Sequence, residues 1–173
     1  MNMCLNMVIC AFVFASGHVF AIDAVPAMDH SHTPIEVPDD VAAPAMALSV
    51  SVDAVSGFNL AVQLDNYLLS PPPDSATMAE LMGVEIDSAS GMLTGHAHLY
   101  VNGKKIQRVY GKYVHLPATL FNDGVNQISV TINNHGHMYW TVAGKKVIAT
   151  TFINTDKAPP VLYSFASFPP SSN

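Results

Sequence analysis

Histidine is the residue type whose spacing in this sequence could support chemistry. Two His-x-His pairs, with one further histidine between them, supply His96, His98, His115, His135 and His137. Neutral imidazole nitrogens bind zinc, copper, iron and nickel. Since side chains alternate between the faces of a β-strand, residues two apart share a face and lie roughly 7 Å apart along it. Two imidazoles of one pair can therefore converge on a single ion.

The first histidine pair is predicted to lie on a β-strand that runs into a hairpin turn. Asn102-Gly103 is a dipeptide that two-residue hairpin turns prefer, and it follows a segment suited to a strand. The alternation of side chains places His96 and His98 on one face of this strand. A two-residue turn would pair Leu99 with Ile106 on the returning strand.

The candidate metal ligands are His96, His98, His115, His135 and His137, with weaker candidates at Met138, Met28, His30 and His32. An all-nitrogen site in an exported protein without thiolates favours Cu(II) or Zn(II). The thioether of Met138 favours copper, as does the segment 28–32, whose Met-Asp-His-Ser resembles repeats of periplasmic copper-resistance proteins. We therefore expect a protein that buffers copper or delivers copper to a periplasmic or cell-surface protein partner. Zinc is the alternative ion.

The same histidines are also consistent with a purely structural role. A histidine in a strand commonly donates its ring N–H to a backbone carbonyl, and here the imidazoles could form a hydrogen-bond cluster with Tyr100, Asn134 and Trp140. Under this alternative the protein is a non-metal β-sandwich interaction module. Its exposed sheet edges would bind another protein or a polymer.

The first 21 residues are predicted to be a signal peptide. Residues 7–16 are almost wholly apolar but too few to span a membrane, and Val19-Phe20-Ala21 has the small-residue spacing of a cleavage site. The segment departs from the usual pattern because no Lys or Arg precedes the apolar run. The expected mature chain is periplasmic or secreted, without a transmembrane segment. Because Cys4 and Cys10 both lie in the signal peptide, the mature chain would contain no disulfide and no thiolate ligand.

Four segments are expected from composition and polarity patterns. A signal peptide (1–21) precedes a disordered, acidic, Pro- and Ala-rich leader (22–46), a β-sandwich domain (47–154) and a disordered tail (155–173). Seven or eight short strands with frequent turns are typical of an all-β, antiparallel, immunoglobulin-like β-sandwich. A Pro-rich insertion at 70–94 interrupts this pattern, with one or two helical turns expected at 75–82, capped by Asp74 or Ser75.

Charge and motifs exclude several function classes. The formal net charge of −6 belongs mainly to the leader, since residues 48–153 carry seven acids and six bases. No basic patch of the kind that nucleic acid requires is present, so nucleic acid is not an expected partner. The sequence also has no nucleophile elbow, no carboxylate pair at a telling spacing and no Gly-rich phosphate loop, so no enzyme activity is expected.

Several segments resemble, in the same order, a group of small exported bacterial β-sandwich domains. The likeness covers about residues 47–153, and its most specific part is the nine-residue hairpin Gly95–Gly103. Further shared features are the His-Leu-Pro strand at 115–117 and the Asn-Asn-His loop at 133–135. That group has no settled activity, so the resemblance implies a β-sandwich fold and an exported location. This chain departs from the group by its insertion at 70–94 and by the extra His137.

Overall fold

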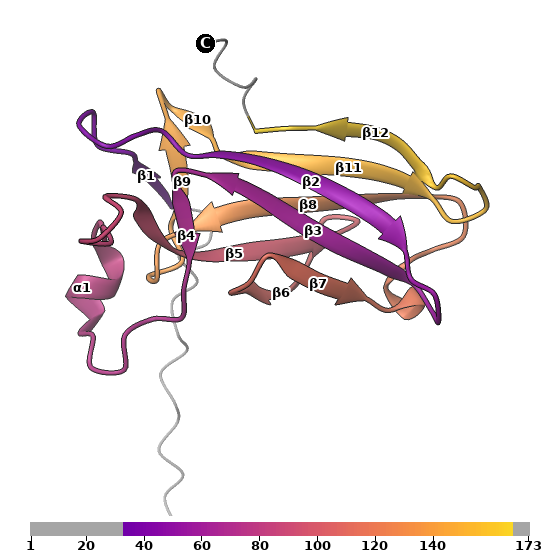
Figure 1. The fold of residues 1–173 in the computed structure, drawn as a ribbon, viewed down its shortest axis with the longest axis horizontal. Coiled ribbons are helices and arrows are strands. Elements are labelled where there is room, and N and C mark those ends of the chain that lie inside the picture. Colours follow the sequence, from indigo (N-terminus) through magenta and orange to yellow (C-terminus); the bar gives the residue numbers. More distant parts are fainter. Residues whose placement is uncertain (1–32, 168–173) are drawn as a thin grey trace, which may run out of the picture.

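The strand that carries His96 and His98 lies inside the larger of two β-sheets in the computed structural model, which describes residues 33–167 (Figure 1). This strand, β5 (Leu93–Val101), pairs antiparallel with β6 (Lys104–Val109) and with β8 (Val125–Asn133). The short strand β4 (Tyr67–Leu69) pairs with the beginning of β5 in parallel. The hairpin predicted from the sequence is therefore present and central.

Within residues 33–167 the larger sheet has nine strands and the smaller sheet has three. The remaining strands of the larger sheet are β1 (Pro34–Glu36), β9 (Tyr139–Val142), β10 (Lys145–Lys146), β11 (Ile148–Asn154) and β12 (Val161–Phe165). The smaller sheet consists of β2 (Ala45–Val52), β3 (Phe58–Asp65) and β7 (Tyr113–Leu116). Figure 1 shows the smaller sheet crossing one side of the larger one. The predicted all-β sandwich is confirmed, and the pairings are antiparallel except β1–β9 and β4–β5.

The hydrophobic core lies between the two sheets. Register places Leu99 of β5 opposite Val130 of β8, so both side chains point to the same face. They form one buried cluster with Leu60 and Val62 of β3. Full burial of each large aliphatic side chain contributes about 1.5–3 kcal/mol, so this face stabilises the sandwich.

The hairpin between β5 and β6 contains a β-bulge that the sequence-based register lacked. Tyr100 lies opposite Lys105, as a two-residue turn requires, but Leu99 lies opposite Gln107 and not Ile106. A bulge inserts one unpaired residue into one strand, and here that residue is Ile106. The expected Leu99–Ile106 pair is therefore wrong by one position.

Parts of the expected leader and tail are ordered strands, which corrects the prediction of disorder there. Residues 34–36 form β1 along β9, where Thr141 Oγ1 donates to the Glu36 carboxylate. Residues 161–165 form β12 along β11, and beyond it Ser167 exchanges two hydrogen bonds with Met46. Unpaired β9 and β11 edges would expose backbone polar groups, which these strands satisfy. Residues 1–32 and 168–173, including the predicted signal peptide, lie outside the described residues.

The insertion at 70–94 contains the one α-helix among the described residues, α1 (Met78–Met82). Its N-cap is Thr77, which forms a capping box with Glu80. The cap therefore lies two to three residues later than predicted. A short 3₁₀ helix, η1, spans Ala118–Leu120. No helix within residues 33–167 has the length and apolar character needed to cross a membrane.

Candidate metal centre

His96 and His98 lie side by side on the face of β5 that points away from the core. Their Nε2 atoms are 2.9 Å apart, and the two residues are only 1% and 0% exposed. The shared face predicted from the strand alternation is confirmed. Without an ion between them, one ring must donate its Nε2–H to the other. With an ion, each Nε2 atom would instead offer a lone pair as a ligand.

His137 completes a cluster of three histidines. Candidate ligand atoms of His96, His98 and His137 all lie within 4.8 Å of one another. The His137 ring centroid is 4.9 Å from that of His96 and 5.3 Å from that of His98. We refer to these three residues as the histidine cluster.

A tight turn after β8 brings His137 to β5. The backbone N–H of His137 donates to Asn134 O, and its carbonyl accepts from the side chain of Asn133. His137 has a φ of +73°, in the left-handed region that non-glycine residues seldom adopt. Such a conformation costs about 1–2 kcal/mol and persists where surrounding hydrogen bonds hold it. The turn therefore places His137 next to the two buried imidazoles at the cost of some backbone strain.

The insertion holds this turn in place. Gly136 N–H donates to Leu81 O at 2.6 Å, and the Asn134 side chain donates to Met82 O and Gly83 O at 3.0 and 3.1 Å. These groups lie in the last turn of α1 and directly after it, where carbonyl groups lack helical partners. The end of α1 is thus coupled to the residues that carry His137.

The cluster is close to the dimensions of a mononuclear metal site. Metal–imidazole bonds are about 2.0–2.1 Å, so a nitrogen separation of 2.9 Å corresponds to an N–metal–N angle of about 90°. Nitrogens on opposite sides of an ion are about 4.1 Å apart at this bond length. The 4.8 Å spread therefore requires His137 to approach by less than about 1 Å.

Burial keeps His96 in the neutral form that binds metals. Desolvation lowers the pKa of His96 to about 2, and neighbouring charges on His98, His137 and Arg108 add to the effect. Protonated imidazole has no lone pair for an ion, so a low pKa preserves ligands at acidic pH. His96 should therefore stay available as a ligand below the ordinary imidazole pKa of about 6.5, where a histidine of a solvated His-x-His peptide becomes protonated.

His135 lies next to the cluster but faces another way. Its ring stacks on His96 at a centroid distance of 6.0 Å, while its Nε2 lies 3.3 Å from Glu85 Oε2 and 3.4 Å from Ser70 Oγ. Burial lowers the pKa of His135, and the Glu85 carboxylate opposes this shift. A Ser-His-Glu triad needs its acid and its serine on different ring nitrogens, so this group is not one.

The other predicted ligands are not part of the histidine cluster. His115 lies on β7 of the smaller sheet, with an exposed side chain whose Nδ1 is 3.9 Å from Asp53 Oδ2. Met138 takes part in the turn through its backbone N–H, which donates to Asn134 Oδ1. The weaker candidates Met28, His30 and His32 lie outside the described residues.

Sequence reasoning missed Glu85 and Tyr110. Glu85 contacts His135, and the Tyr110 ring centroid lies 5.6 Å from that of His96. Neither residue stands at a telling spacing from a histidine, since Glu85 reaches the site from the insertion. The sequence feature that could have suggested Glu85 is its position in the insertion at 70–94, which is long enough to fold back over the sheet.

The buried histidines predict a loss of stability in weak acid. The folded-state pKa values of His96 and His135 lie below the unfolded value of about 6.5, so below that pH the unfolded chain binds protons that the folded chain does not. The unfolding free energy should fall from pH 7 to pH 5, by up to about 1.4 kcal/mol per pH unit for each histidine that stays neutral. Urea unfolding followed by Trp140 fluorescence measures this. A flat profile contradicts the prediction.

Comparison with models of protein families, with curated proteins and with solved structures found no match to this chain. The resemblance to exported bacterial domains therefore stays a prediction. The fold and the site define the protein as a β-sandwich with a largely buried three-histidine cluster that could hold a metal ion.

Proposed function

We propose that this protein is an exported copper-binding protein that holds one ion at His96, His98 and His137 and buffers it or delivers it to a partner. The observation that carries the proposal is the convergence of three imidazoles, two of them buried with Nε2 atoms 2.9 Å apart. Imidazole ligands without thiolates suit divalent copper and zinc.

A site with nitrogen ligands generally binds Cu(II) more tightly than Zn(II). Tetrahedral zinc would place two imidazole nitrogens about 3.3 Å apart, whereas square or tetragonal Cu(II) places neighbouring nitrogens about 2.9 Å apart. The His96–His98 separation of 2.9 Å is the length of a hydrogen bond between the two rings, and it is also compatible with the second value. Zinc is the alternative ion and would require these rings to move apart.

Storage or transfer fits this site better than catalysis. Three protein ligands leave one position at the ion open, but two of these ligands are almost completely buried, which restricts the access of a substrate to that position. The signal-peptide character of residues 1–21 supports export, so the partner that receives the ion would be a periplasmic or cell-surface protein.

The test is a titration of the proposed mature chain, residues 22–173, with Cu(II) and Zn(II) in competition with a chelator of known affinity. We expect each chain to bind one Cu(II) tightly, and the electron paramagnetic resonance spectrum of this ion to show nitrogen ligands. A His30→Ala/His32→Ala variant should retain this ion, which separates the cluster from the leader. Binding no tighter than that of a His-x-His peptide would support the structural alternative and the interaction module.

Replacing His137 by alanine should weaken copper binding while the sandwich stays folded. Four ligands supply about 10–16 kcal/mol to a structural zinc ion, so one ligand corresponds to about 3 kcal/mol, or about 100-fold in affinity. His115→Ala is the matched control, because this exposed residue lies on the other sheet. The His115→Ala variant should bind copper as tightly as the parent chain. Equal losses in the two variants, measured by chelator competition, would place the ion elsewhere.

A further inference from the structure

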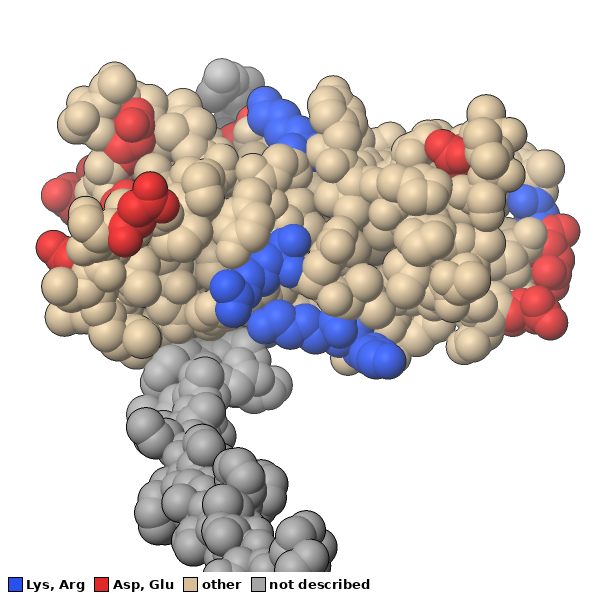
Figure 2. Space-filling view, turned by 90° about the horizontal axis from the view of Figure 1, so that it is seen from below, with Lys and Arg blue, Asp and Glu red and all other residues tan. Residues whose placement is uncertain are grey.

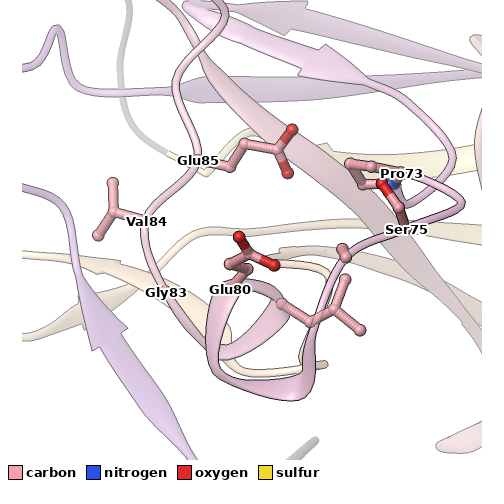
Figure 3. Close-up of a pocket in the computed structure, with 8 residues that line it drawn as sticks. Pro73, Ser75, Glu80, Gly83, Val84 and Glu85 are labelled. Carbon is pink, nitrogen blue, oxygen red and sulfur yellow. The ribbon is translucent and has the colours of Figure 1, made fainter.

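The histidine cluster leaves one position at a bound ion without a ligand from the described residues. Three imidazoles converge there, whereas tetrahedral zinc and square Cu(II) both take four ligands. Within residues 33–167 no other His, Cys, Asp or Glu joins the three at ligand distance. Figure 3 shows the carboxylates of Glu80 and Glu85 directed into the pocket beside α1, and Glu85 contacts His135. The carboxylates of the insertion thus do not complete the site.

The first described residues of the chain lie beside the turn that carries His137. Tyr139 N–H donates to Thr33 O at 3.0 Å, and Pro34 of β1 lies opposite Tyr139 in a parallel pair. Two residues before this pair, the two segments contain His32 and His137. Consecutive Cα atoms are about 3.8 Å apart and neighbouring strands about 4.8 Å apart, so the chain tethers His32 close to His137.

The pairing of the strands also defines the face on which this segment meets the cluster. His96 of β5 lies opposite Asn133 of β8, and Asn133 lies opposite Tyr139 of β9. Since Tyr139 lies opposite Pro34, these four residues form one row across the larger sheet. Side chains in one row share a face, and strand alternation returns to that face two residues earlier, at position 32. An imidazole at position 32 therefore belongs to the face of the histidine cluster, and one at position 33 to the opposite face.

The sequence before Thr33 alternates potential ligands with other residues. Met28, His30 and His32 stand at every second position of Met-Asp-His-Ser-His. In an extended chain this spacing directs the three side chains to one face, and thioether and imidazole are both ligands for copper. If the signal peptide is removed, residues 22–32 remain, and they span up to about 40 Å when extended. That length is enough to cross the four strand spacings from β1 to β6, about 19 Å in total.

Basic residues on the face of the cluster complement the acidic leader. Arg108 of β6 lies opposite His98, and Lys105 lies opposite Tyr100. Residues three apart in a regular strand point to opposite faces, but the bulge at Ile106 places both basic side chains on the face of the histidine cluster. Figure 2 shows Lys and Arg side chains gathered near the middle of one face of the molecule, and residues 22–32 contain two acids and no Lys or Arg. Opposite charges therefore favour a path of the leader across the cluster.

We propose that the leader segment 28–32 closes over the histidine cluster when the ion binds and that His32 supplies the fourth ligand. This inference rests on the proposed function, because it completes the same site. A tethered ligand competes at an effective concentration in the millimolar range, so the site closes without a second protein. The sheet and the turn hold the other three ligands, which makes His32 the ligand most easily replaced. A partner that offers its own imidazole or thioether displaces the leader and receives the ion by exchange of one ligand at a time.

Competition between residues 22–173 and a chelator for Cu(II) tests the fourth ligand, with His32→Ala as the variant. Loss of one ligand should weaken Cu(II) binding by about 100-fold, while the ion stays on the three histidines of the cluster. The electron paramagnetic resonance spectrum should show one coupled nitrogen fewer. His30→Ala is the matched control, because it removes an imidazole two residues away, and it should bind Cu(II) as tightly as the parent chain.

An exchange variant, His32→Thr/Thr33→His, tests the face on which the imidazole lies. It keeps the composition of the leader and moves the imidazole to the opposite face of the strand. It should weaken Cu(II) binding as much as His32→Ala does. Thr33 is exposed and accepts its hydrogen bond through the backbone carbonyl, so the exchange should leave the unfolding free energy in urea unchanged.

The outcomes separate this inference from the proposed function. Weaker binding and the loss of one coupled nitrogen in both His32→Ala and the exchange variant, with His30→Ala unchanged, support the fourth ligand. An unchanged Cu(II) affinity in His32→Ala, or tight binding by the exchange variant, overturns it while the proposed function stands. If the parent chain binds no Cu(II) tightly, or if a His96→Leu/His98→Leu variant binds it as tightly as the parent chain, the proposed function fails and the fourth ligand fails with it.

Discussion

A His96→Leu/His98→Leu variant is expected to lose copper binding at the cluster while the β-sandwich stays folded. Removing two of three ligands corresponds to about 6 kcal/mol, or a loss of affinity of about 10⁴-fold. Leucine is close to histidine in size, and replacing both partners of a buried polar contact by apolar groups is nearly neutral for stability. We therefore expect the unfolding free energy to change by less than about 1.5 kcal/mol.

This variant separates the metal role from the structural one. If the two histidines serve only to hydrogen-bond each other, the double variant should keep the Cu(II) affinity and the unfolding free energy of the parent chain. Only the pH dependence of the unfolding free energy should change. Chelator competition with Cu(II) and urea unfolding should be measured on the same preparation, with His115→Leu as the control. If a folded double variant still binds one Cu(II) tightly, His96 and His98 are not ligands of that ion.

The largest effect on stability is expected from Gly95→Ala, one residue before the cluster. A Cβ at position 95 would lie 2.3 Å from Asn133 O and 2.3 Å from the Tyr67 hydroxyl oxygen. The Tyr67 hydroxyl donates a buried hydrogen bond to Asn133 O, and the new methyl group would push these atoms apart. Overpacking and a φ of +156° together should lower the unfolding free energy by about 3–5 kcal/mol.

Gly103→Ala is the matched control for this prediction. Gly103 also has a positive φ, +79°, but no atom lies within 4 Å of the position that its Cβ would occupy. Only backbone strain applies there, so we expect a loss of about 1 kcal/mol in the same urea experiment. If both variants lose a similar amount of unfolding free energy, the close approach of β5 to Asn133 and Tyr67 adds nothing to the cost of the Gly95 substitution.

Local patterns were sufficient for the hairpin and for two of the three residues of the histidine cluster. The period of two in a strand placed His96 and His98 on one face, and Asn102-Gly103 placed the turn. Both inferences involve residues close together in the chain. The bulge at Ile106 was not predicted because β6 is mostly polar and has little alternation that one extra residue could interrupt.

The choice of the third histidine was a question of long-range pairing. His135 and His137 follow β8, which pairs with β5 so that His96 lies opposite Asn133. His115 lies on β7, which pairs with β3 in the other sheet. Sequence spacing treats His115 and His137 alike, since each is far from the first pair along the chain. Only the sheet order separates them.

By itself, the sequence determined the all-β class, the central hairpin and the shared face of His96 and His98, because strand alternation and turn preferences act over a few residues. Tertiary structure alone decided that His137 joins the cluster, that Glu85 reaches His135, and that burial holds His96 neutral. These features depend on contacts between segments tens of residues apart. Such contacts follow from how the sheets pack and pair, which no local pattern encodes.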